Sequence, residues 1–510
     1  MNRSNSSASD RSNTSAGSDF LQLDVKDAPA GALADWLAGQ LRRAISDGRL
    51  PVGGRLPATR VLAADLRVSR GVVTEAYQRL TEDGHIAGRG RSGTVVVAAP
   101  LPGARANGSR ANGSRVNGSR VNGPVPRAPF AGAPGADVFD VIRAAPARID
   151  LSPGVPDLAA FPRAVWLRAE RAVLRDLSAA AFGYGDPRGT PALRLAVADW
   201  LARNRGIRAD PDEVIVVAGV AQALTLLGEV LAAGGTRAVA VEDPGALGAR
   251  QHLAARGLDT PPVPVDEDGV RVDALWASGA PAVLLTPAHQ FPMGVVLGGE
   301  RRRELMRWAE EGGLIVEDDY DAEHRYDRPP VPALRSMLAE RVCYGGSMSK
   351  LLAPALRVGW LLPPPGLRDA LVDAKRYADL GNAALPQLVL ARLMESGELE
   401  RQLRFLRGRH RRRRDAMIAA IGERLPGATV HGAAAGLHLT ITFDAGFADT
   451  DLAAAALARG VKAHPLSWHA QLPHRPGLVL GYAASTPTVL TEAVALLADA
   501  RRAVTGRGAA

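Results

Sequence analysis

Apolar residues recur at helical spacing close to the start of this chain. A first amphipathic helix is predicted over residues 31–48, and its apolar face consists of Leu33, Trp36, Leu37, Leu41 and Ile45. A second helix is predicted over Thr59–Leu66, with Thr59 in the N-cap position. A third is predicted over Arg70–Asp83, where Ser69 is the N-cap. The tight turn between the last two helices indicates a helix-turn-helix.

A glycine-rich hairpin is predicted directly after the third helix. Residues 85–97 read HIAGRGRSGTVVV, which indicates two short strands around a Gly/Arg tip that includes Arg89. A three-helix bundle with exposed arginines would share the helices but not this order, so we favour a winged helix-turn-helix. In that fold the N-terminal residues of the third helix reach base edges in the major groove of double-stranded DNA. Here these residues are Ser69, Arg70, Gly71, Val72 and Thr74.

From about Ile149 the pattern changes to short β-branched runs separated by Ala/Leu/Arg-rich stretches, which predicts an α/β fold. The predicted strands are Val214–Ala218, Ala238–Glu242, Ala282–Thr286, Leu314–Asp318, Val342–Gly345 and Val358–Leu362. The predicted helices are Thr190–Asn204, Gln222–Ala233, Gly245–Arg256, Gly299–Glu311 and Pro365–Tyr377. We expect a mostly parallel sheet covered on both faces. Strands at Leu437–Phe443 and Leu478–Gly481 indicate a smaller C-terminal α+β lobe.

Composition divides the chain into four segments. Residues 1–20 are polar and aperiodic and are expected to be a disordered tail, and residues 21–99 form the winged helix-turn-helix domain. Residues 100–136 contain a five-residue repeat of Arg, a small residue, Asn, Gly and Ser, which cannot bury a core and predicts a flexible linker. Residues 137–510 form the large domain.

Charge separates the front of the chain from its body. Residues 1–136 contain 18 basic and 10 acidic residues, whereas the other 374 residues contain 44 basic and 43 acidic residues. A basic front end indicates a polyanion partner for that part only. The single cysteine, Cys343, excludes an internal disulfide, and we expect it to pack in the core. Neither a secretory signal nor a membrane span is expected, which favours the cytoplasm.

Lysine is rare, which narrows the search for a lysine that could bind a carbonyl cofactor. The large domain has three, and we expect Lys375 to be solvated on an amphipathic helix and Lys462 to begin an exposed strand. Lys350 instead follows an apolar strand and Gly-Gly, where ligands bind in such sheets. Ser347 and Arg357 lie close by in the sequence and suit a phosphate. On spacing alone, a purely structural loop remains an equal alternative.

A second element supports a cofactor site. The segment LIVEDDYDAEHRY places acids at the end of a strand that we expect to be buried, where an acid needs a partner. A protonated pyridine nitrogen of a cofactor is such a partner. An ionised Asp beside it keeps this nitrogen protonated, so that the ring can act as an electron sink. A metal site or an N-cap are the alternatives. No further acids or clustered His follow a ligand pattern, so no metal is expected.

The front domain resembles the DNA-binding domain of the GntR family of bacterial regulators. The resemblance rests on GRLPVGGRLPATRVLAADLRVSRGVVTEAYQRLTEDGHI and GRSGT, within residues 21–99. It implies that the Arg of the LPxxR segment, the Ser-Arg pair and the wing glycines contact DNA. In this sequence they are Arg60, Ser69, Arg70, Gly90 and Gly93.

Residues 150–500 are similar to fold-type I aminotransferases, and their sequence motifs resemble those of the MocR subfamily of GntR regulators. The motifs that carry this resemblance are YGDPRGTPALR, VEDPG, TPAHQFPMG, VEDDYDAEHRY, GSMSK and GLHL. The resemblance implies pyridoxal 5′-phosphate as cofactor and a homodimer. The resemblance implies that Lys350 forms the internal aldimine, that Asp318 pairs with the pyridine nitrogen and that Tyr320 contacts the ring oxygen. It implies that the cofactor phosphate is bound by Ser347, Arg357 and the backbone amides of Gly219, Val220 and Ala221. Tyr184 is expected to reach the phosphate in the partner subunit.

The sequence departs from the aminotransferase pattern at three places. Ala246 stands where the family has an aromatic residue that stacks on the pyridine ring. Phe291 takes the place of an Asn, as it does in the resembled subfamily. The LVLGY strand lacks an Arg for a substrate carboxylate, and Arg475 is the only candidate close to it.

Three functions were weighed. The first is a transcription regulator that senses pyridoxal phosphate, or an amine or amino acid that reacts with it, through an aldimine at Lys350. The second is an aminotransferase with an accessory DNA-binding domain. The third is a DNA-binding protein whose large domain only dimerises. The presence of Lys350, Asp318 and Arg357 argues against the third, and Ala246 and the missing Arg argue against efficient turnover, so the first is predicted.

Overall fold

The computed structural model divides the chain into two units, residues 1–122 and 123–510. It describes residues 32–47, 49–88, 93–98, 129–130, 132–326, 331–444 and 446–507, preceded by residues 23, 25, 28 and 29. The tail predicted at residues 1–20 and nearly all of the predicted linker therefore lie outside the described residues. We call residues 129–507 the effector unit and describe the two units separately.

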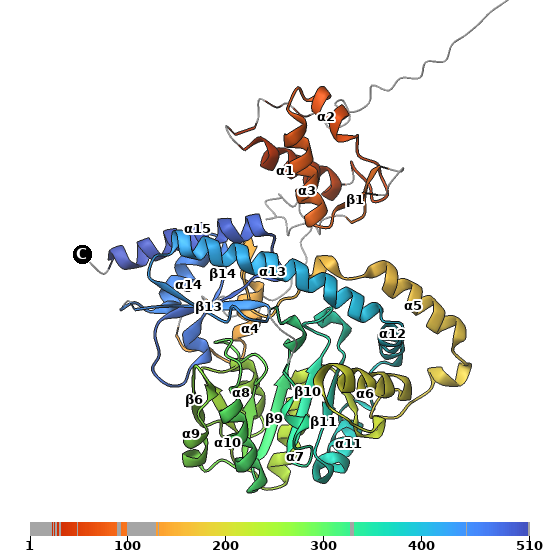
Figure 1. Ribbon diagram of the computed structural model, residues 1–510, viewed down its shortest axis with the longest axis vertical. Coiled ribbons are helices and arrows are strands. Elements are labelled where there is room, and N and C mark those ends of the chain that lie inside the picture. Colours follow the sequence, from red (N-terminus) through yellow and green to blue (C-terminus); the bar gives the residue numbers. More distant parts are fainter. Residues whose placement is uncertain are drawn as a thin grey trace, which may run out of the picture. The chain divides into compact units, whose positions relative to one another are not determined.

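The N-terminal unit contains three helices and a hairpin (Figure 1). They are α1 (Leu33–Ser46), α2 (Thr59–Asp65), α3 (Arg70–Glu82), β1 (Ile86–Gly88) and β2 (Thr94–Val96). The strands pair antiparallel, with Ile86 opposite Val96. This order of elements is the predicted winged helix-turn-helix.

The helices of this unit pack through the stripe that the sequence pattern indicated. Leu37, Leu41 and Ile45 of α1 are buried, and α3 adds Val73 and Leu80 to the same core. At the start of α3, the Ser69 hydroxyl accepts a hydrogen bond from the Val72 amide at 3.4 Å, which confirms Ser69 as the N-cap. The N-cap of α2 is Ala58 rather than Thr59, because the helix begins at Thr59 itself.

The effector unit is built on an eight-stranded sheet with the order β4-β11-β10-β9-β8-β5-β6-β7. Its strands are β4 (Ile215–Val217), β5 (Ala240–Asp243), β6 (Pro262–Asp266), β7 (Gly269–Val270), β8 (Ala282–Leu285), β9 (Leu314–Asp319), β10 (Val342–Ser347) and β11 (Gly359–Leu362). The five central strands β10, β9, β8, β5 and β6 are parallel, and the others are antiparallel to their neighbours. The carboxyl ends of the parallel strands therefore meet along one edge.

Helices cover both faces of this sheet because its strands alternate between two apolar layers. In β4, Ile215 and Val217 pack in one core and Val216 in another. The covering helices are α5 (Arg163–Asp176), α6 (Pro191–Arg205), α7 (Val220–Ala233), α8 (Leu247–Ala254), α9 (Val272–Ser278), α10 (Gly299–Glu310), α11 (Pro365–Asp379) and α12 (Ala384–Glu395). Cys343 lies in the same core as Ile215, as predicted, and burial raises its pKa to about 12.

A C-terminal lobe, residues 398–507, carries a four-stranded sheet ordered β12-β13-β16-β15. Its elements are α13 (Glu398–Arg424), β12 (Ala428–His431), β13 (His438–Phe443), α14 (Asp449–Ala458), β14 (Val461–Lys462), β15 (His464–Pro465), β16 (Gly477–Gly481) and α15 (Pro487–Arg507). The long helices α13 and α15 run side by side next to this sheet (Figure 1). The chain enters the effector unit through α4 (Val138–Ala144) and β3 (Ile149–Asp150), and β3 pairs with β14.

A buried ion pair joins α6 to the central sheet. Arg205 ends α6 with its side chain fully buried, and its Nε donates to Asp319 Oδ2 of β9 at 2.5 Å. The same carboxylate oxygen accepts from the Tyr344 hydroxyl at 2.6 Å. Arg205 also donates to the carbonyl of Val331. The charge on Asp319 thus has two donors within the core.

We expect Arg205→Met to destabilise the effector unit by about 3–5 kcal/mol, because Asp319 would keep a buried charge without its cation. The melting transition of the effector unit, followed by calorimetry, should move to lower temperature, and that of the N-terminal unit should stay in place. Arg203→Met is the matched control on the same helix, since Arg203 is exposed and its pair with Glu400 spans 3.5 Å. Equal melting temperatures for the two variants would contradict the assigned role.

Candidate functional site: a pocket at the sheet edge

One pocket of the effector unit, about 510 Å³ in volume, lies at the carboxyl edge of the parallel strands. Asp318 at the end of β9 and Ser347 at the end of β10 both line it, and Thr286 lines it after β8. Open α/β sheets bind ligands at this edge, because strand ends and helix N-termini converge there. Ten of the predicted site residues lie in this unit.

Lys350 lies in the pocket, three residues after β10. Its Nζ donates a hydrogen bond to the carbonyl of Gly154 at 2.7 Å. Gly154 has φ +76°, a conformation that favours glycine, and a Cβ atom there would lie 2.6 Å from Nζ, so a larger residue would be strained and would displace the end of the lysine side chain. Burial lowers the pKa of Lys350, while the charge of Asp318 opposes this shift. A lysine with a lowered pKa is a better nucleophile toward an aldehyde.

Asp318 faces the pocket from the neighbouring strand, paired in register with Gly345 of β10. Its Oδ1 is buried and accepts no hydrogen bond from the described residues. Burial, followed by the charge of Asp319, raises the pKa of Asp318 to about 7, and the charge of Lys350 works against this rise. A buried carboxyl group without a partner indicates a ligand that supplies one.

Tyr320 also lines the pocket, and its hydroxyl is fixed by a histidine. It donates to the carbonyl of His289 at 3.0 Å and lies 3.0 Å from His289 Nδ1. The same ring nitrogen contacts Asp321 Oδ2 at 3.0 Å, with both side chains buried. Burial and the charge of Asp321 raise the pKa of Tyr320, so its hydroxyl stays protonated. No role for His289 was predicted from the sequence, where it stands two residues before Phe291.

A cradle for an anion lies at the N-terminus of α7. Gly219, the N-cap residue, has φ +90°, and a Cβ atom there would lie 3.7–3.8 Å from Arg357 Nη1, Ser349 Oγ and Ser347 Oγ. Val220 and Ala221 open the helix and line the same space. Free amides at a helix N-terminus attract anions. The structure thus brings together all the predicted phosphate residues of this chain and adds Ser349, which sequence reasoning missed.

The segment by which the chain enters the unit forms one wall of the pocket. From residues 139–155, the wall is lined by Phe139, Ile142, Arg143, Asp150, Ser152, Pro153, Gly154 and Val155. Arg143 is a cation that the sequence reasoning missed, since nothing in the sequence links α4 to residues 200 positions later. Its side chain is 74% exposed and pairs with Asp140 at 2.8 Å.

Two predicted residues do not line the pocket. Arg475, the candidate for a substrate carboxylate, is exposed and pairs with Asp444 at 2.8 Å. Tyr184 is 97% exposed and touches no part of the pocket within its own chain. Its assignment to the pocket of a partner subunit stays a prediction.

The departures from the aminotransferase pattern lie in the pocket. Ala246 is the N-cap residue of α8 and leaves one side of the pocket without an aromatic ring at that position. Phe291 lines the pocket, with its ring edge toward Tyr320 at 6.2 Å and toward His469 at 5.0 Å.

The other two lysines are buried, contrary to our expectation. Lys375 is 0% exposed, and its Nζ donates to Asp379 at 2.6 Å and to Asn382 at 2.7 Å. Lys462 is 4% exposed and donates to the carbonyl of Arg143 at 3.3 Å. Neither lysine lines the pocket, although the partners of Lys462, Arg143 and Asp150, belong to its wall, so Lys350 is the lysine of the site.

His289, Asp321 and His438 are grouped closely enough to be considered as metal ligands, with ligand atoms within 4.8 Å of one another. One ring nitrogen of each histidine is already used, since His289 Nδ1 contacts Asp321 and His438 Nε2 donates to the carbonyl of Pro292 at 3.1 Å, whereas His289 Nε2 and His438 Nδ1 are buried without a partner among the described residues. A Cβ atom at Gly436 would lie 2.5 Å from His289 Nδ1, so the cluster has little free space. We interpret it as support for Tyr320.

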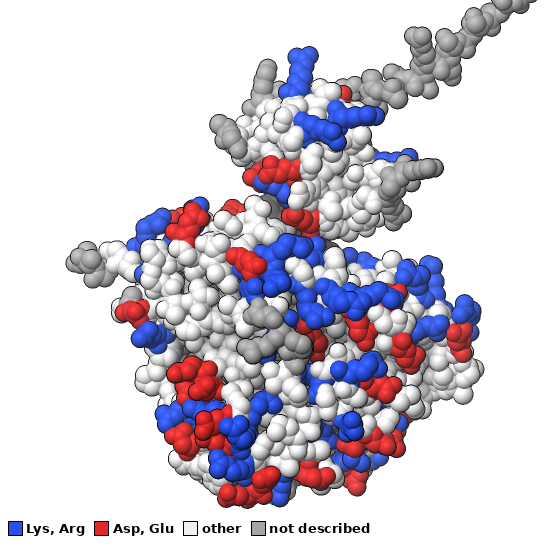
Figure 2. All heavy atoms as spheres, in the orientation of Figure 1, with Lys and Arg blue, Asp and Glu red and all other residues white. Residues whose placement is uncertain are grey.

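The predicted DNA-contacting residues of the N-terminal unit are exposed wherever the structure describes them. These are Arg60, Ser69, Arg70, Gly71, Thr74 and Gly93. Arg60 and Arg70 have no ion-pair partner among the described residues. Arg89 and Gly90 lie outside the described residues. Figure 2 shows basic side chains standing out from this unit on the face drawn, as phosphate binding requires.

Comparison with known families identifies both parts of the chain. Residues 33–96 match bacterial regulatory proteins of the gntR family, and residues 147–495 match class I and II aminotransferases. Among solved structures, a multiple substrate aminotransferase from Thermococcus profundus covers 72% of this chain and 94% of its own, with TM-score 0.66 and 28% identity. The α-aminoadipate aminotransferase LysN from Thermus thermophilus covers 74% and 97%, with TM-score 0.67 and 27% identity.

Full-length relatives combine the same two parts. The probable rhizopine catabolism regulatory protein MocR of Rhizobium meliloti is 32% identical over 92% of this chain and 94% of its own. The regulator TauR of Rhodobacter capsulatus is 33% identical over 92% and 97%. The fold and these matches define a DNA-binding transcription regulator with an aminotransferase-like domain whose cofactor is pyridoxal phosphate. The chain belongs to the MocR subfamily of the GntR family. Among the described residues, no helix is long and apolar enough to span a bilayer.

The raised pKa of Asp318 makes the stability of the cofactor-free protein depend on pH. The folded state binds the Asp318 proton up to about pH 7, whereas the unfolded state binds it only up to about pH 4. Protonation of Asp318 therefore contributes fully to the free energy of unfolding at low pH, and this contribution is lost as the pH rises through 7. Asp318→Asn should therefore reduce the loss of stability between pH 5 and pH 8 by roughly 2–3 kcal/mol. Melting curves at both pH values test this, with the exposed Asp199→Asn as control.

Proposed function

We propose that the protein senses pyridoxal phosphate, or an amine or amino acid that reacts with it, through a covalent link at Lys350, and adjusts transcription in response. The observation that carries this proposal is the convergence of Lys350, the unpartnered carboxyl of Asp318 and the Gly219 cradle in one pocket. When bound, the cofactor supplies an aldehyde that condenses with primary amines.

The residues fit this group at each of its polar ends. We assign the aldehyde to Lys350, the pyridine nitrogen to Asp318 and the ring oxygen to Tyr320. Ser347, Arg357 and the amides of Gly219, Val220 and Ala221 suit the phosphate, to which we add Ser349. The Asp318 carboxylate would gain the hydrogen-bond donor that its Oδ1 lacks among the described residues. The volume of about 510 Å³ leaves room for a small amine beside the cofactor.

On the DNA side, we propose that a cytoplasmic homodimer presents two winged helices to paired half-sites of an operator. Ser69 at the start of α3 and the exposed Arg70, Gly71 and Thr74 suit the major groove, with Arg60 and the wing beside them. The ligand changes the operator affinity only if it binds the two states of the protein with different affinity. Residues 100–136 connect the two domains in this proposal.

The alternative is a catabolic aminotransferase with an accessory DNA-binding domain. Two features favour the sensor. Ala246 provides no ring to stack on the cofactor, and Arg475 lies outside the pocket, paired with Asp444. Arg143 is the cation at the pocket wall that could take a carboxylate instead. Steady multiple turnover of an amino acid with a keto acid would support the alternative.

We expect the protein, saturated with pyridoxal phosphate and desalted, to retain a visible absorption band that Lys350→Arg abolishes. The substitution retains the positive charge near Asp318 but cannot condense with an aldehyde. Absorption spectra with and without candidate amines report both the cofactor and its ligand. Lys375→Arg is the control, because Lys375 is paired with Asp379 outside the pocket. A band that survives in Lys350→Arg would refute the lysine assignment.

Arg70→Ala should weaken binding to a specific operator by roughly 10- to 100-fold, the equivalent of about 1–3 kcal/mol, if Arg70 reads a base. The operator can be selected from random DNA with the full chain, and affinities measured by fluorescence anisotropy at fixed salt. Arg43→Ala is the control, because Arg43 is exposed on α1, outside the predicted DNA-contacting residues. Equal losses for both variants would reduce the role of Arg70 to a phosphate contact.

A further inference from the structure

A second cavity of about 830 Å³ lies between the C-terminal lobe and the rest of the large domain. Its large-domain wall comes from residues 265–267, 293–299 and 302, and its lobe wall from His431, Gly432 and Ala434. It shares no lining residue with the pocket of Lys350. At one side the two walls touch through glycines, since a Cβ atom on Gly294 would lie 2.2 Å from Gly432 Cα.

Arg302 lines this cavity from the first turn of α10, and two of its three guanidinium nitrogens lack a hydrogen-bond acceptor among the described residues. The residue is 8% exposed, and its Nε and Nη2 are buried without an acceptor in the part of the chain that the structure describes. Glu317 and Asp319 act on it only through their charge, without a hydrogen bond. Buried guanidinium donors are normally satisfied, so two unsatisfied ones beside a cavity indicate a missing acceptor.

The N-terminus of α10 opens into the same space. Gly298 and Gly299 line the cavity, and Gly298 at the N-cap position offers no side-chain cap. Among the described residues, the first-turn amides of Gly299, Glu300 and Arg301 donate to no acceptor. Arg302 lies four positions after the N-cap, about one helical turn, so the amides and the guanidinium lie close together along the helix. Helix dipole and guanidinium therefore favour the same kind of ligand, an oxyanion.

The acids at the cavity do not cancel this preference. Asp266 lines the cavity, but its carboxylate is already bonded to Arg301 at 2.7 Å and accepts from the Asp268 amide at 3.0 Å. Glu267 is exposed at the edge. A second buried cation, Arg325, lines the cavity as well.

We propose that this cavity is a second ligand site, for a small metabolite that carries a carboxylate or phosphate group. Arg302 and the amides of Gly299 and its neighbours bind the oxyanion, and the lobe residues His431 and Gly432 enclose the rest of the molecule. Because its walls belong to both the large domain and the lobe, a bound anion stabilises one arrangement of the two. The site is independent of Lys350, so the proposed sensing function can fail without affecting it.

The test is calorimetric titration of the full-length protein, saturated with pyridoxal phosphate, with inorganic phosphate in one arm and succinate in the other. At least one probe should bind, and Arg302→Gln should lower its affinity tenfold or more. The arm that binds tells phosphate from carboxylate ligands. Gly299→Pro is a second variant: proline at the first helical position removes one amide donor and suits the helix. It should weaken binding without lowering the melting temperature.

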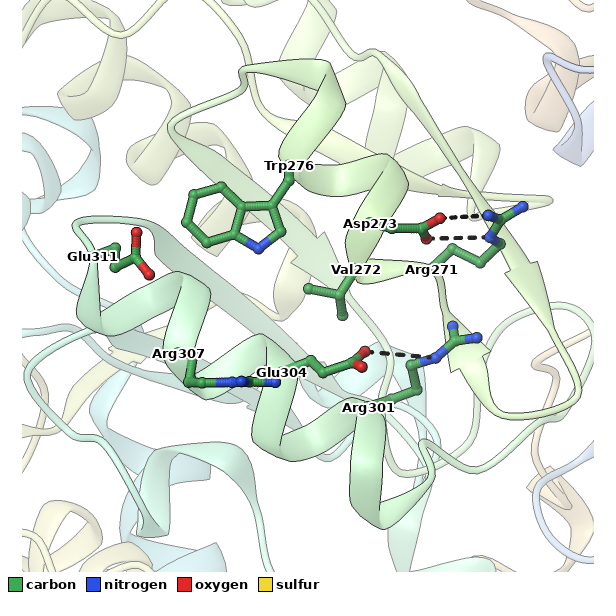
Figure 3. Close-up of a pocket in the computed structure, with 8 residues that line it drawn as sticks. All are labelled: Arg271, Val272, Asp273, Trp276, Arg301, Glu304, Arg307 and Glu311. Carbon is green, nitrogen blue, oxygen red and sulfur yellow. Dashed lines mark hydrogen bonds and ion pairs between the residues drawn. The ribbon is translucent and has the colours of Figure 1, made fainter.

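Arg307→Gln is the matched control on the same helix. Arg307 is exposed and lines a separate surface pocket of about 460 Å³ together with Trp276 and Glu311 (Figure 3). Binding should be unchanged in this variant and in Arg357→Gln, which alters only the cofactor cradle. The proposal is overturned if neither probe binds, if Arg302→Gln and Gly299→Pro bind like the wild type, or if only Arg357→Gln loses binding.

Discussion

The run of acids that ends β9 is the constraint on which the effector unit depends. Four carboxyl groups occur within five positions, at Glu317, Asp318, Asp319 and Asp321. Strand alternation sends Glu317 and Asp319 to one face and Asp318 to the other. Glu317 accepts from two backbone amides, Asp319 from Arg205, and Asp321 contacts His289. Asp318 and Asp319 each keep one buried oxygen without a hydrogen-bond partner among the described residues, but Asp319 is paired with Arg205 through its other oxygen, and Asp318 is the one that faces the pocket.

Arginine plays two different parts in the two units. In the N-terminal unit Arg60 and Arg70 are exposed, where they raise the attraction for a polyanion. In the effector unit several arginines are buried, and Arg205 and Arg335 donate to carboxylates and carbonyls, with Nη2 of Arg205 left without an acceptor among the described residues. A near-neutral total for residues 137–510 thus includes buried cations whose charges are balanced locally. Arg302 departs from this rule, because its buried donors have no such acceptor in the described chain.

The sequence pattern predicted those helices and strands whose formation depends mainly on neighbouring residues in the chain. Six strands of the central sheet were predicted, because strands buried on both faces are continuous β-branched runs. β6 and β7 were missed: β6 contains Pro262 and Pro264, and prolines argue against a strand. The burial of Lys375 was missed because α11 continues to Asp379, two residues beyond the predicted end, where its i,i+4 partner lies. Ser349, Arg143 and the position of Arg475 depend on tertiary contacts that no spacing reveals.

The entry segment at residues 139–155 has a mechanical consequence. It is the stretch of the effector unit that directly follows the connection from the DNA-binding unit, and Gly154 within it accepts the hydrogen bond of Lys350. Its β3 is also clamped to β14 of the lobe. A ligand that binds Lys350 in its place would remove the hydrogen bond to Gly154, and the segment that would lose this bond is continuous in the sequence with the connection to the DNA-binding unit.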